Sequence, residues 1–564
     1  MLQNLPIGTQ SFEKLRKRAG IYVDKTQYIL QMLNTTGTVY FLSRPRRFGK
    51  SLLISTLEAV FRGRKELFEG LYIYDKWDWN DKFPVIHLDF GKESHSTGEE
   101  LTLSLTDFVD ATARDNQISL QKHTLTGKFS ELIQQLHETT GQQVVVLVDE
   151  YDKPITDHLS NQEVLEANKT VLHDFYQVLK AADDHIRFIF LTGVSKFSGL
   201  SVFSALNNPH DITISEDYAA LCGYTQDELE KYFAEHIDNY THEKNVSRQD
   251  LLDDIKRWYD GYSWDGKTSV YNPFSTLMFF AERSFDNYWF RTGTPTFLME
   301  LLKSRNQITP ILENKKADSG LFEGYDTADL DEIALLFQTG YLTIKDVNSI
   351  DPENKEYTLG IPNSEVRNAF FRRLLSAYSH YPVSSVQRLI LDMQQQIYNS
   401  DTSGLEQNLR MLLANIPYIL HQKNEAYYHS MFLVWMKMLG FEPQGEVPTS
   451  TGRIDSVLHH ADLTVVAEIK YSAKKGAEKL LNEAMTQIRD RRYYERYLDR
   501  KVILMAVAFA GKEVRCRLEG LEIQFPQSLL VQEKPCVHPY WGQVDAKTSE
   551  NGFSRFREST FVGK

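Results

Sequence analysis

Short apolar runs alternate with amphipathic segments over the first 215 residues of the chain. We predict strands at five of these runs: Val39–Leu42, Val85–Phe90, Gln143–Glu150, Ile186–Leu191 and Asp211–Ser215. Between them, apolar residues recur every three or four positions, which predicts helices over Leu52–Phe61, Glu100–Asn116 and Thr124–Thr139. A chain in which strands and helices alternate in this way is predicted to form a mostly parallel, doubly wound α/β sheet.

The pattern becomes mainly helical after residue 215. Thr225 is followed by acids, as a helix N-cap should be, and together with a helix over Leu251–Tyr259 it predicts a helical lid. The aromatic-rich turn Trp258–Trp264 is predicted to be a packing corner rather than a contact surface. Further along, helices precede two strands, Tyr341–Lys345 and Glu356–Gly360. This order resembles a winged helix, which would serve either as a DNA-binding module or as a spacer.

A second alternation of elements follows a helical connector that begins near Ser384. The predicted order is helix, strand, strand, helix and strand, over Asn424–Leu439, Gly452–Leu458, Leu463–Tyr471, Ala477–Leu498 and Lys501–Phe509. This order predicts a second, smaller α/β domain.

Length and composition indicate several folded domains, and they bear on nucleic-acid binding and on the cellular compartment. The 564 residues are 42% apolar and 25% charged, which is enough to bury large cores. The net charge of −13 excludes a global attraction to nucleic acid, so DNA binding would need a local basic patch. Three widely spaced cysteines fit a reducing cytoplasm. Residues 1–7 lack a signal-peptide pattern and no apolar run is long enough to span a membrane, so we predict a cytoplasmic protein without a membrane partner.

The first candidate site is the turn between the first strand and the first helix. Lys50 would reach the β- and γ-phosphates of ATP, and the Ser51 hydroxyl would ligate Mg²⁺. The P-loop pattern asks for glycine where Arg44 stands, so Gly49-Lys50-Ser51 alone is equally compatible with an ordinary basic turn. The upstream segment 7–26 either shapes the adenine pocket or is a surface lead-in. The turn and the helix N-terminus would together bind the phosphates through Arg46, Arg47, Phe48, Gly49, Lys50, Ser51 and Leu52.

Two acids end the strongly apolar run that starts at residue 143. A buried parallel strand delivers such carboxylates to its C-terminal edge, so this is a Walker B pattern. Asp149 would hold Mg²⁺ through water, and Glu150 would orient and deprotonate the attacking water. At the end of the next strand, Thr192 or Ser195 is a candidate for sensing the γ-phosphate, although a plain strand end in a glycine turn explains the pattern almost as well.

The second candidate site follows from the register of the predicted C-terminal hairpin. A turn between residues 461 and 462 pairs His460 with Leu463, and counting outward places Asp455 opposite Glu468. Lys470, two residues further, shares the face of Glu468. Two opposed carboxylates repel each other unless a cation lies between them. This face therefore predicts a divalent metal, Mg²⁺ or Mn²⁺, that activates water for phosphodiester hydrolysis.

Seven motifs in this order resemble those of the AAA-ATPase-like family of prokaryotic proteins, which usually carries a C-terminal PD-(D/E)XK nuclease-superfamily domain. The resemblance extends over nearly the whole chain and rests on Tyr22–Thr26, Ser43–Ser51, Leu147–Pro154, Leu191–Ser198, Leu206–Pro209, Trp258–Tyr262 and Val270–Phe274. It implies that Arg44 belongs to the family's usual form of the P-loop. It also implies that Glu425 and Gln487 complete the nuclease site and that the Ile469 carbonyl is a further metal ligand.

The fold that we expect is α/β: an ASCE-type P-loop ATPase with a helical lid, a winged-helix-like middle region and a C-terminal PD-(D/E)XK nuclease-like domain. The expected boundaries are 1–215, 216–284, 285–383, 384–535 and a tail over 536–564. The expected function is an ATP-hydrolysing protein coupled to a Mg²⁺-dependent nuclease that acts on DNA. The alternative is an NTP-driven switch whose nuclease-like domain only binds nucleic acid or a partner protein. Such ATPases usually complete their site with an arginine from a neighbour or hold one in cis, so we also predict a homo-oligomer.

Overall fold

The computed structural model describes residues 2–196, 206, 209–289, 315–322, 331–349, 355–379, 383–414, 425–449, 452–460, 462–492, 494–511 and 513–521. The expected tail over 536–564 therefore lies outside the described residues. So do residues 290–314 and 323–330 of the expected middle region.

The N-terminal domain is built on a five-stranded parallel sheet. Its strands are β1 (Val39–Ser43), β2 (Val85–Asp89), β3 (Val144–Asp149), β4 (Ile186–Gly193) and β5 (His210–Asp211). Their order across the sheet is β2-β3-β4-β1-β5, and every pair is parallel. Strand β4 thus lies between the P-loop strand and the strand that ends in the two acids, which is the arrangement of additional-strand P-loop ATPases. The fifth strand was predicted over Asp211–Ser215, but β5 comprises only His210 and Asp211, so the prediction is wrong for all but its first residue.

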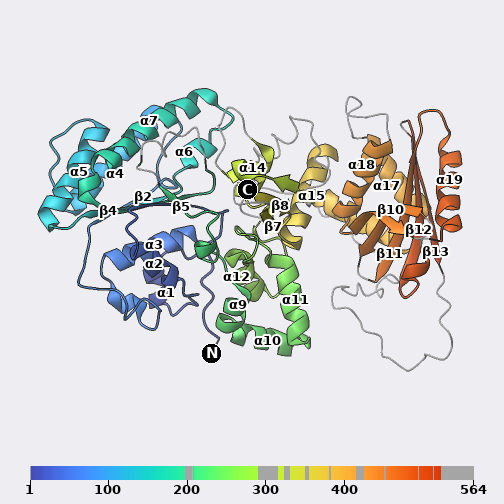
Figure 1. Ribbon diagram of the computed structural model, residues 1–564, viewed down its shortest axis with the longest axis horizontal. Helices are drawn as coiled ribbons and strands as arrows, with labels where there is room; N and C mark the ends of the chain where they lie inside the picture. Colours follow the sequence, from blue (N-terminus) through green and yellow to red (C-terminus); the bar gives the residue numbers. More distant parts are fainter. Residues whose placement is uncertain are drawn as a thin grey trace, which may run out of the picture. The chain divides into compact units, whose positions relative to one another are not determined.

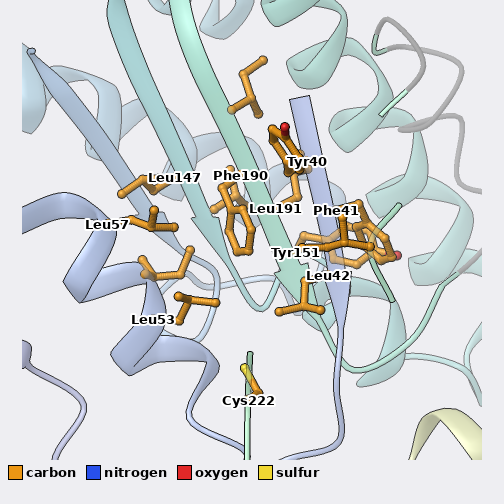
Figure 2. Close-up of a cluster of buried hydrophobic side chains, with 14 of the residues drawn as sticks. Tyr40, Phe41, Leu42, Leu53, Leu57, Leu147, Tyr151, Phe190, Leu191 and Cys222 are labelled. Carbon is orange, nitrogen blue, oxygen red and sulfur yellow. The ribbon is translucent and has the colours of Figure 1, made fainter. Parts of the chain in front are cut away.

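Helices cover both faces of this sheet, as the doubly wound prediction requires (Figure 1). They are α1 (Phe12–Lys17), α2 (Thr26–Leu33), α3 (Lys50–Phe61), α4 (Gly98–Asp115), α5 (Leu125–Thr140), α6 (Lys153–Thr156) and α7 (Gln162–Ala181). Figure 2 shows Leu53 and Leu57 of α3 pointing toward Leu147 and Phe190 of the sheet. These four side chains are at most 6% exposed, so burial of their apolar surface fixes α3, and with it the P-loop, against the strands.

The lid is a separate helical cluster, as predicted. It comprises α9 (Gln226–Tyr232), α10 (Ala234–Lys244), α11 (Arg248–Tyr259) and α12 (Pro273–Glu282). Thr225 and Glu228 form a capping box at the start of α9, which confirms the predicted helix start. The cluster also buries Ile21 and Val23 from the N-terminal segment, so the chain upstream of the P-loop packs on the lid.

The middle region contains a helix followed by a β-ribbon, as expected. Its elements are β6 (Lys315–Ala317), α14 (Glu332–Gln338), β7 (Thr343–Ser349), β8 (Lys355–Gly360) and α15 (Ser364–Ser379). The three strands form an antiparallel sheet in the order β6-β8-β7. Ile344 and Leu359 of this ribbon belong to the same hydrophobic core as the P-loop sheet. The ribbon is therefore packed with the ATPase sheet.

The C-terminal domain has its own five-stranded sheet and its own core. It comprises α16 (Val383–Tyr398), α17 (Thr402–Ala414), α18 (Glu425–Met438), β9 (Glu442–Thr449), β10 (Gly452–His460), β11 (Leu463–Tyr471), α19 (Ala477–Asp490), β12 (Lys501–Ala510) and β13 (Glu513–Leu521). The order is β13-β12-β11-β10-β9, with β11 parallel to β12 and antiparallel to β10. Helices α16, α17 and α18 pack with one face of β11 and β12.

The predicted set of C-terminal elements needs two corrections. The helix predicted to run to Leu498 ends at Asp490, because the chain leaves the helical conformation and Arg492 has a φ of 48°. Strands β9 and β13 were not predicted, because Pro443, Pro448 and the alternating charges of β13 obscure their apolar pattern.

Among the described helices, none combines the length and the apolar character that a bilayer crossing requires.

Candidate functional site

The P-loop is the turn between β1 and α3, and two of its residues have left-handed backbone conformations. Gly49 has a φ of 88° and Arg47 a φ of 69°. Lys50 begins α3 and is only 7% exposed. Its Nζ donates to the carbonyl oxygens of Arg44 and Pro45, at 2.9 and 3.0 Å. Burial lowers the pKa of Lys50, against the opposing charge of Asp149. The ammonium group therefore rests on loop carbonyls at the floor of the turn.

Arg44, which stands where the P-loop pattern has glycine, is fully buried and turned away from this turn. Its guanidinium donates to the carbonyl oxygens of Ser43 and Thr213, at 2.9 and 2.7 Å, and lies 4.0 Å from the ring centroid of Trp264. Burial lowers the pKa of Arg44 to about 10. The Arg44 side chain thus links β1 to the residues that follow β5, and it stabilises the P-loop through this link.

The two acids at the end of β3 differ in their surroundings. Asp149 is 3% exposed and its Oδ1 accepts a hydrogen bond from the backbone N–H of Glu150, at 3.0 Å. Glu150 has a φ of 51°, which turns the chain sharply after the strand. Its side chain is 44% exposed and lines the same cavity as Gly49, Lys50 and Ser51. The cavity therefore brings the predicted water-activating carboxylate to the predicted phosphate loop.

This cavity, of about 380 Å³, also contains the N-terminal segment. Tyr22, Val23 and Lys25 line it, and Tyr224 and Phe274 contribute aromatic rings from the lid. Of the two readings of the upstream segment, the structure thus supports a pocket wall rather than a surface lead-in. A pocket lined by aromatic rings and apolar side chains as well as by a lysine-containing turn matches a nucleotide in chemistry and in size.

The residues around the cavity also suit a magnesium ion bound with the nucleotide. The Ser51 hydroxyl lines the cavity, and Asp149 lies close enough to Lys50 to act on its pKa. Hydroxyl and carboxylate oxygens are the ligands that Mg²⁺ prefers.

In the C-terminal domain, the hairpin register agrees with the prediction. His460 pairs with Leu463, and the pairing continues in step to Ser456 and Ala467. One further residue along each strand places Asp455 opposite Glu468. The Asp455 side chain lies outside what the structure describes, so its contact with a metal stays a prediction.

Glu468 is a fully buried carboxylate on β11. Lys470 lies two residues further along the same face, and its Nζ donates to Glu468 Oε1 at 2.7 Å. The same Nζ lies 3.9 Å from Oε1 of Glu425, at the start of α18. Glu425, which lies more than 40 residues earlier in the sequence, therefore meets Glu468 and Lys470 at one end of β11. A buried carboxylate held beside a lysine, with a second carboxylate near, suits a divalent cation.

Gln487 lies on α19, which packs against β11 and β12. It lines an open groove on this helix together with Glu483, four residues before it. Lys475 donates to Glu483 at 2.8 Å, and this hydrogen bond, with a smaller contribution from the charge of Lys470, lowers the pKa of Glu483. Glu483 was not among the predicted site residues, because an exposed helix glutamate carries no signal in a single sequence.

Two family models match the chain over the two candidate sites. Residues 6–203 match the model described as "Predicted AAA-ATPase", and residues 423–519 match the model of the PD-(D/E)XK nuclease superfamily. A relative from Azotobacter chroococcum mcd 1, "Uncharacterized protein in vnfD 5'region", is 38% identical over 516 residues, which cover 90% of this chain and 96% of that protein. The chain belongs to the AAA-ATPase-like family with a C-terminal PD-(D/E)XK domain.

A solved structure, "Structure of Drosophila ORC bound to GC-rich DNA and Cdc6", matches with a TM-score of 0.24 and 12% identity. The match covers 75% of this chain, which spans 59% of that chain. At this TM-score the likeness carries no argument about fold or function.

Both residues predicted as γ-phosphate sensors, Thr192 and Ser195, lie at or just after the end of β4, the strand that pairs with the P-loop strand β1. Thr192 Oγ1 donates to the Leu42 carbonyl at 2.8 Å, so this side chain is bonded within the sheet, and it is not among the residues that line the cavity. The backbone N–H of Ser195 donates to Oδ2 of Asp152 at 2.7 Å. The role of Thr192 stays a prediction.

Sequence reasoning missed Asp152 in this family's Asp-Glu-Tyr-Asp motif. Asp152 is 2% exposed, and its carboxylate also accepts from the backbone N–H of Val194 at 3.1 Å. Burial raises the pKa of Asp152 to about 6. Tyr151 provides a second link between the same two segments, since its hydroxyl donates a hydrogen bond to the Ser195 carbonyl at 2.7 Å. These two residues hold the chain at the end of β4 close to the end of β3.

Across the described residues, no group of three or more His, Cys, Asp or Glu side chains converges as a ready-made metal cluster. A metal ion at either candidate site would therefore also need backbone, hydroxyl or water oxygens as ligands, in addition to the carboxylates.

Proposed function

We propose that the N-terminal domain binds and hydrolyses ATP with Mg²⁺. The observation that carries the proposal is the single cavity that Gly49, Lys50 and Ser51 share with Glu150. Lys50 would exchange its loop carbonyls for phosphate oxygens, and Ser51 and Asp149 would hold Mg²⁺, which supplies countercharge for the phosphates. Glu150 would orient the attacking water and accept its proton. Arg46, Arg47, Phe48 and Leu52 would surround the phosphates with the remainder of the loop.

Phosphate release from ATP tests this proposal. Glu150→Gln should bind ATP but turn over at least about 100-fold more slowly, because an amide cannot accept the proton from water. Lys50→Ala should lose nucleotide affinity, because the countercharge is removed. Glu138→Gln, an exposed glutamate at the end of α5, is the matched control and should behave as wild type. Undiminished turnover in Glu150→Gln would remove Glu150 from the mechanism.

We further propose that the C-terminal domain cleaves DNA with Mg²⁺ or Mn²⁺. The juxtaposition of buried Glu468 with Lys470 and Glu425 supports this proposal. Asp455, Glu468 and the Ile469 carbonyl would hold the metal ion, and Glu425 would bind it through water. Lys470 would stabilise the charge that builds up on the phosphate, and Gln487 would orient the substrate or water from α19.

Cleavage of circular and linear DNA, with and without ATP, should be measured beside metal titration by calorimetry. Asp455→Ala and Glu468→Gln should lose cleavage and weaken metal binding, whereas Lys470→Ala should slow cleavage about 100-fold and still bind metal. ATP turnover should survive all three changes. Glu478→Gln, on the exposed first turn of α19, is the control. Equal metal affinity in wild type and Asp455→Ala would remove the nuclease assignment.

The second candidate function is the nucleotide-driven switch, in which the C-terminal domain only binds DNA or a partner protein. One observation favours it. The rings of Tyr262 and Trp264 contact Phe48 of the P-loop. The backbone N–H of Ser263, which lies between them, donates a hydrogen bond to Thr343 at the start of β7. The P-loop is thus in direct contact with a segment bonded to the middle ribbon. ATP turnover without DNA cleavage under any metal would promote this candidate.

A further inference from the structure

Lys153, three residues after Glu150, lines the proposed ATP cavity but has no role in the mechanism above. It is the first residue of α6 and its side chain is 27% exposed. Its Nζ lies 3.1 Å from Oδ2 of Asp157 and 4.0 Å from Oε2 of Glu150. The ammonium group is thus shared unequally between two carboxylates, with Asp157 as the closer partner.

Asp157 is itself held by a second partner, the imidazole ring of His95. His95 Nε2 lies 3.1 Å from the same Oδ2, and His95 Nδ1 contacts the Glu93 carbonyl at 2.7 Å. Burial alone would raise the pKa of Asp157, but the hydrogen bond with His95 and the charge of Lys153 outweigh it and lower that pKa to about 2. Asp157 therefore stays ionised and can keep its bond to His95 when Lys153 moves away.

Four other described lysines and arginines line the cavity: Lys25, Arg46, Arg47 and Lys50. Arg46 is exposed and belongs to the phosphate loop itself. Lys25 donates to both carboxylate oxygens of Glu228, at 2.7 and 2.6 Å. Lys50 rests on loop carbonyls, and the Arg47 guanidinium lies 4.6 Å from the ring centroid of Phe274. Of the cavity-lining cations in the described residues, Lys153 is the one with an ion pair to Glu150. A bound triphosphate brings several negative charges to this end of the cavity, and a lysine on a flexible four-carbon stem can turn to meet them.

We propose that Lys153 is the cation, held in cis, that distinguishes a nucleoside triphosphate from a diphosphate in this cavity. Without nucleotide it pairs with Asp157 and Glu150; with a triphosphate it contacts the terminal phosphate and leaves Glu150 unpaired for water. Asp157 and His95 hold Lys153 in its resting place. The inference rests on the proposed ATP site and adds a residue that reports the γ-phosphate.

Calorimetric binding of AMP-PNP and of ADP to the full chain, both with Mg²⁺, tests the inference without any turnover. Wild type should bind AMP-PNP more tightly than ADP. Lys153→Ala should lose about tenfold in affinity for AMP-PNP, the value of one charge-assisted hydrogen bond, and keep its affinity for ADP within about twofold. Lys153→Arg should keep most of the preference. Asp157→Asn should bind AMP-PNP more tightly than wild type, because Lys153 is then released at lower cost.

Lys128→Ala is the matched control, since Lys128 pairs with Asp110 at 2.6 Å between α4 and α5 and does not line the cavity. It should leave both affinities unchanged. Thermal melts of each variant separate lost binding from lost folding. The same AMP-PNP to ADP ratio in wild type and Lys153→Ala, or weaker AMP-PNP binding in Asp157→Asn, overturns the role of Lys153. Failure of wild type to bind either nucleotide instead overturns the ATP site itself.

Discussion

Two non-glycine residues at the ATP cavity, Arg47 and Glu150, have left-handed backbone conformations. Such a conformation costs an L-residue roughly 1–2 kcal/mol, so the surrounding packing must hold it in place. At Glu150 the turn places the side chain beside Lys153 in the cavity, whereas the preceding Asp149 stays buried at the strand end. The strained positions therefore coincide with the residues that we propose to contact nucleotide and water.

A buried carboxyl group provides a prediction at the same scale. Glu365, in the first turn of α15, is fully buried, and its Oε1 accepts from the backbone N–H of Trp289 at 2.7 Å. Burial raises the pKa of Glu365 to about 8. Because the folded pKa lies above the unfolded value of 4.5, the native state binds a proton that the unfolded chain has released between these two pH values. The free energy of unfolding should therefore fall as pH rises from about 5 to 8, by about 1.4 kcal/mol per pH unit from this group.

Glu365→Gln, which stays neutral, should gain stability relative to wild type over this pH range. Melting temperatures at pH 5, 6, 7 and 8 check the difference. Glu356→Gln, a partly exposed residue of β8 paired with Lys316, is the control and should show no such trend. A difference between Glu365→Gln and wild type that is the same at every pH would contradict the assignment.

At the scale of elements, the P-loop is held by the aromatic turn after α11 as well as by its own strand and helix. Tyr262 and Trp264 pack edge-on against Phe48, with centroid distances of 4.8 and 5.4 Å. Trp264 also covers the Arg44 guanidinium. The Arg44 guanidinium is fully buried and donates to the backbone carbonyls of Ser43, Thr213 and Tyr218. The face of Trp264 adds a cation–π contact to this buried charge. A glycine at position 44 would leave the space beside Trp264 unfilled.

Trp264→Ala should therefore destabilise the protein by about 3–5 kcal/mol and weaken ATP binding about tenfold, because both the loop and Arg44 lose support. Trp264→Phe, which keeps an aromatic face, should recover most of the affinity. Trp258→Ala is the control: this tryptophan lies in the last turn of α11, packs on Tyr259 and Phe285, and does not line the cavity. It should lower the melting temperature and leave ATP affinity unchanged. An equal loss of affinity in both alanine variants would show that Trp264 acts only through stability.

At the scale of the whole molecule, the described apolar side chains fall into three clusters. One joins the P-loop sheet to the ribbon of the middle region, one forms the lid and one belongs to the C-terminal domain. The ribbon therefore shares one hydrophobic core with the P-loop sheet. The C-terminal site is built on a core of its own, which is why we expect Lys470→Ala to spare ATP turnover.

The sequence by itself determined most of the elements and the order of the motifs. Most strands and helices of both domains follow from periodicities of two and 3.6 residues, which are local, and the hairpin pairing of β10 with β11 follows from the length of its turn. Strands β9 and β13 lack such a periodicity and were not predicted. The positions of Lys50, Glu150, Glu468 and Lys470 followed from the same local patterns. Helix α19 was predicted too long, because its polar C-terminal residues continue the composition of a helix after its backbone has turned.

The tertiary structure alone decided which side chains face which neighbours. Arg44 is turned from the cavity by carbonyls of residues about 170 positions later in the chain, and Thr192 is bonded to a strand 150 positions earlier. The group formed by Glu150, Lys153, Asp157 and His95 combines a strand end with a loop more than 50 residues upstream. No local pattern encodes such contacts, because they depend on the order of strands in the sheet and on which loops that order brings to one edge.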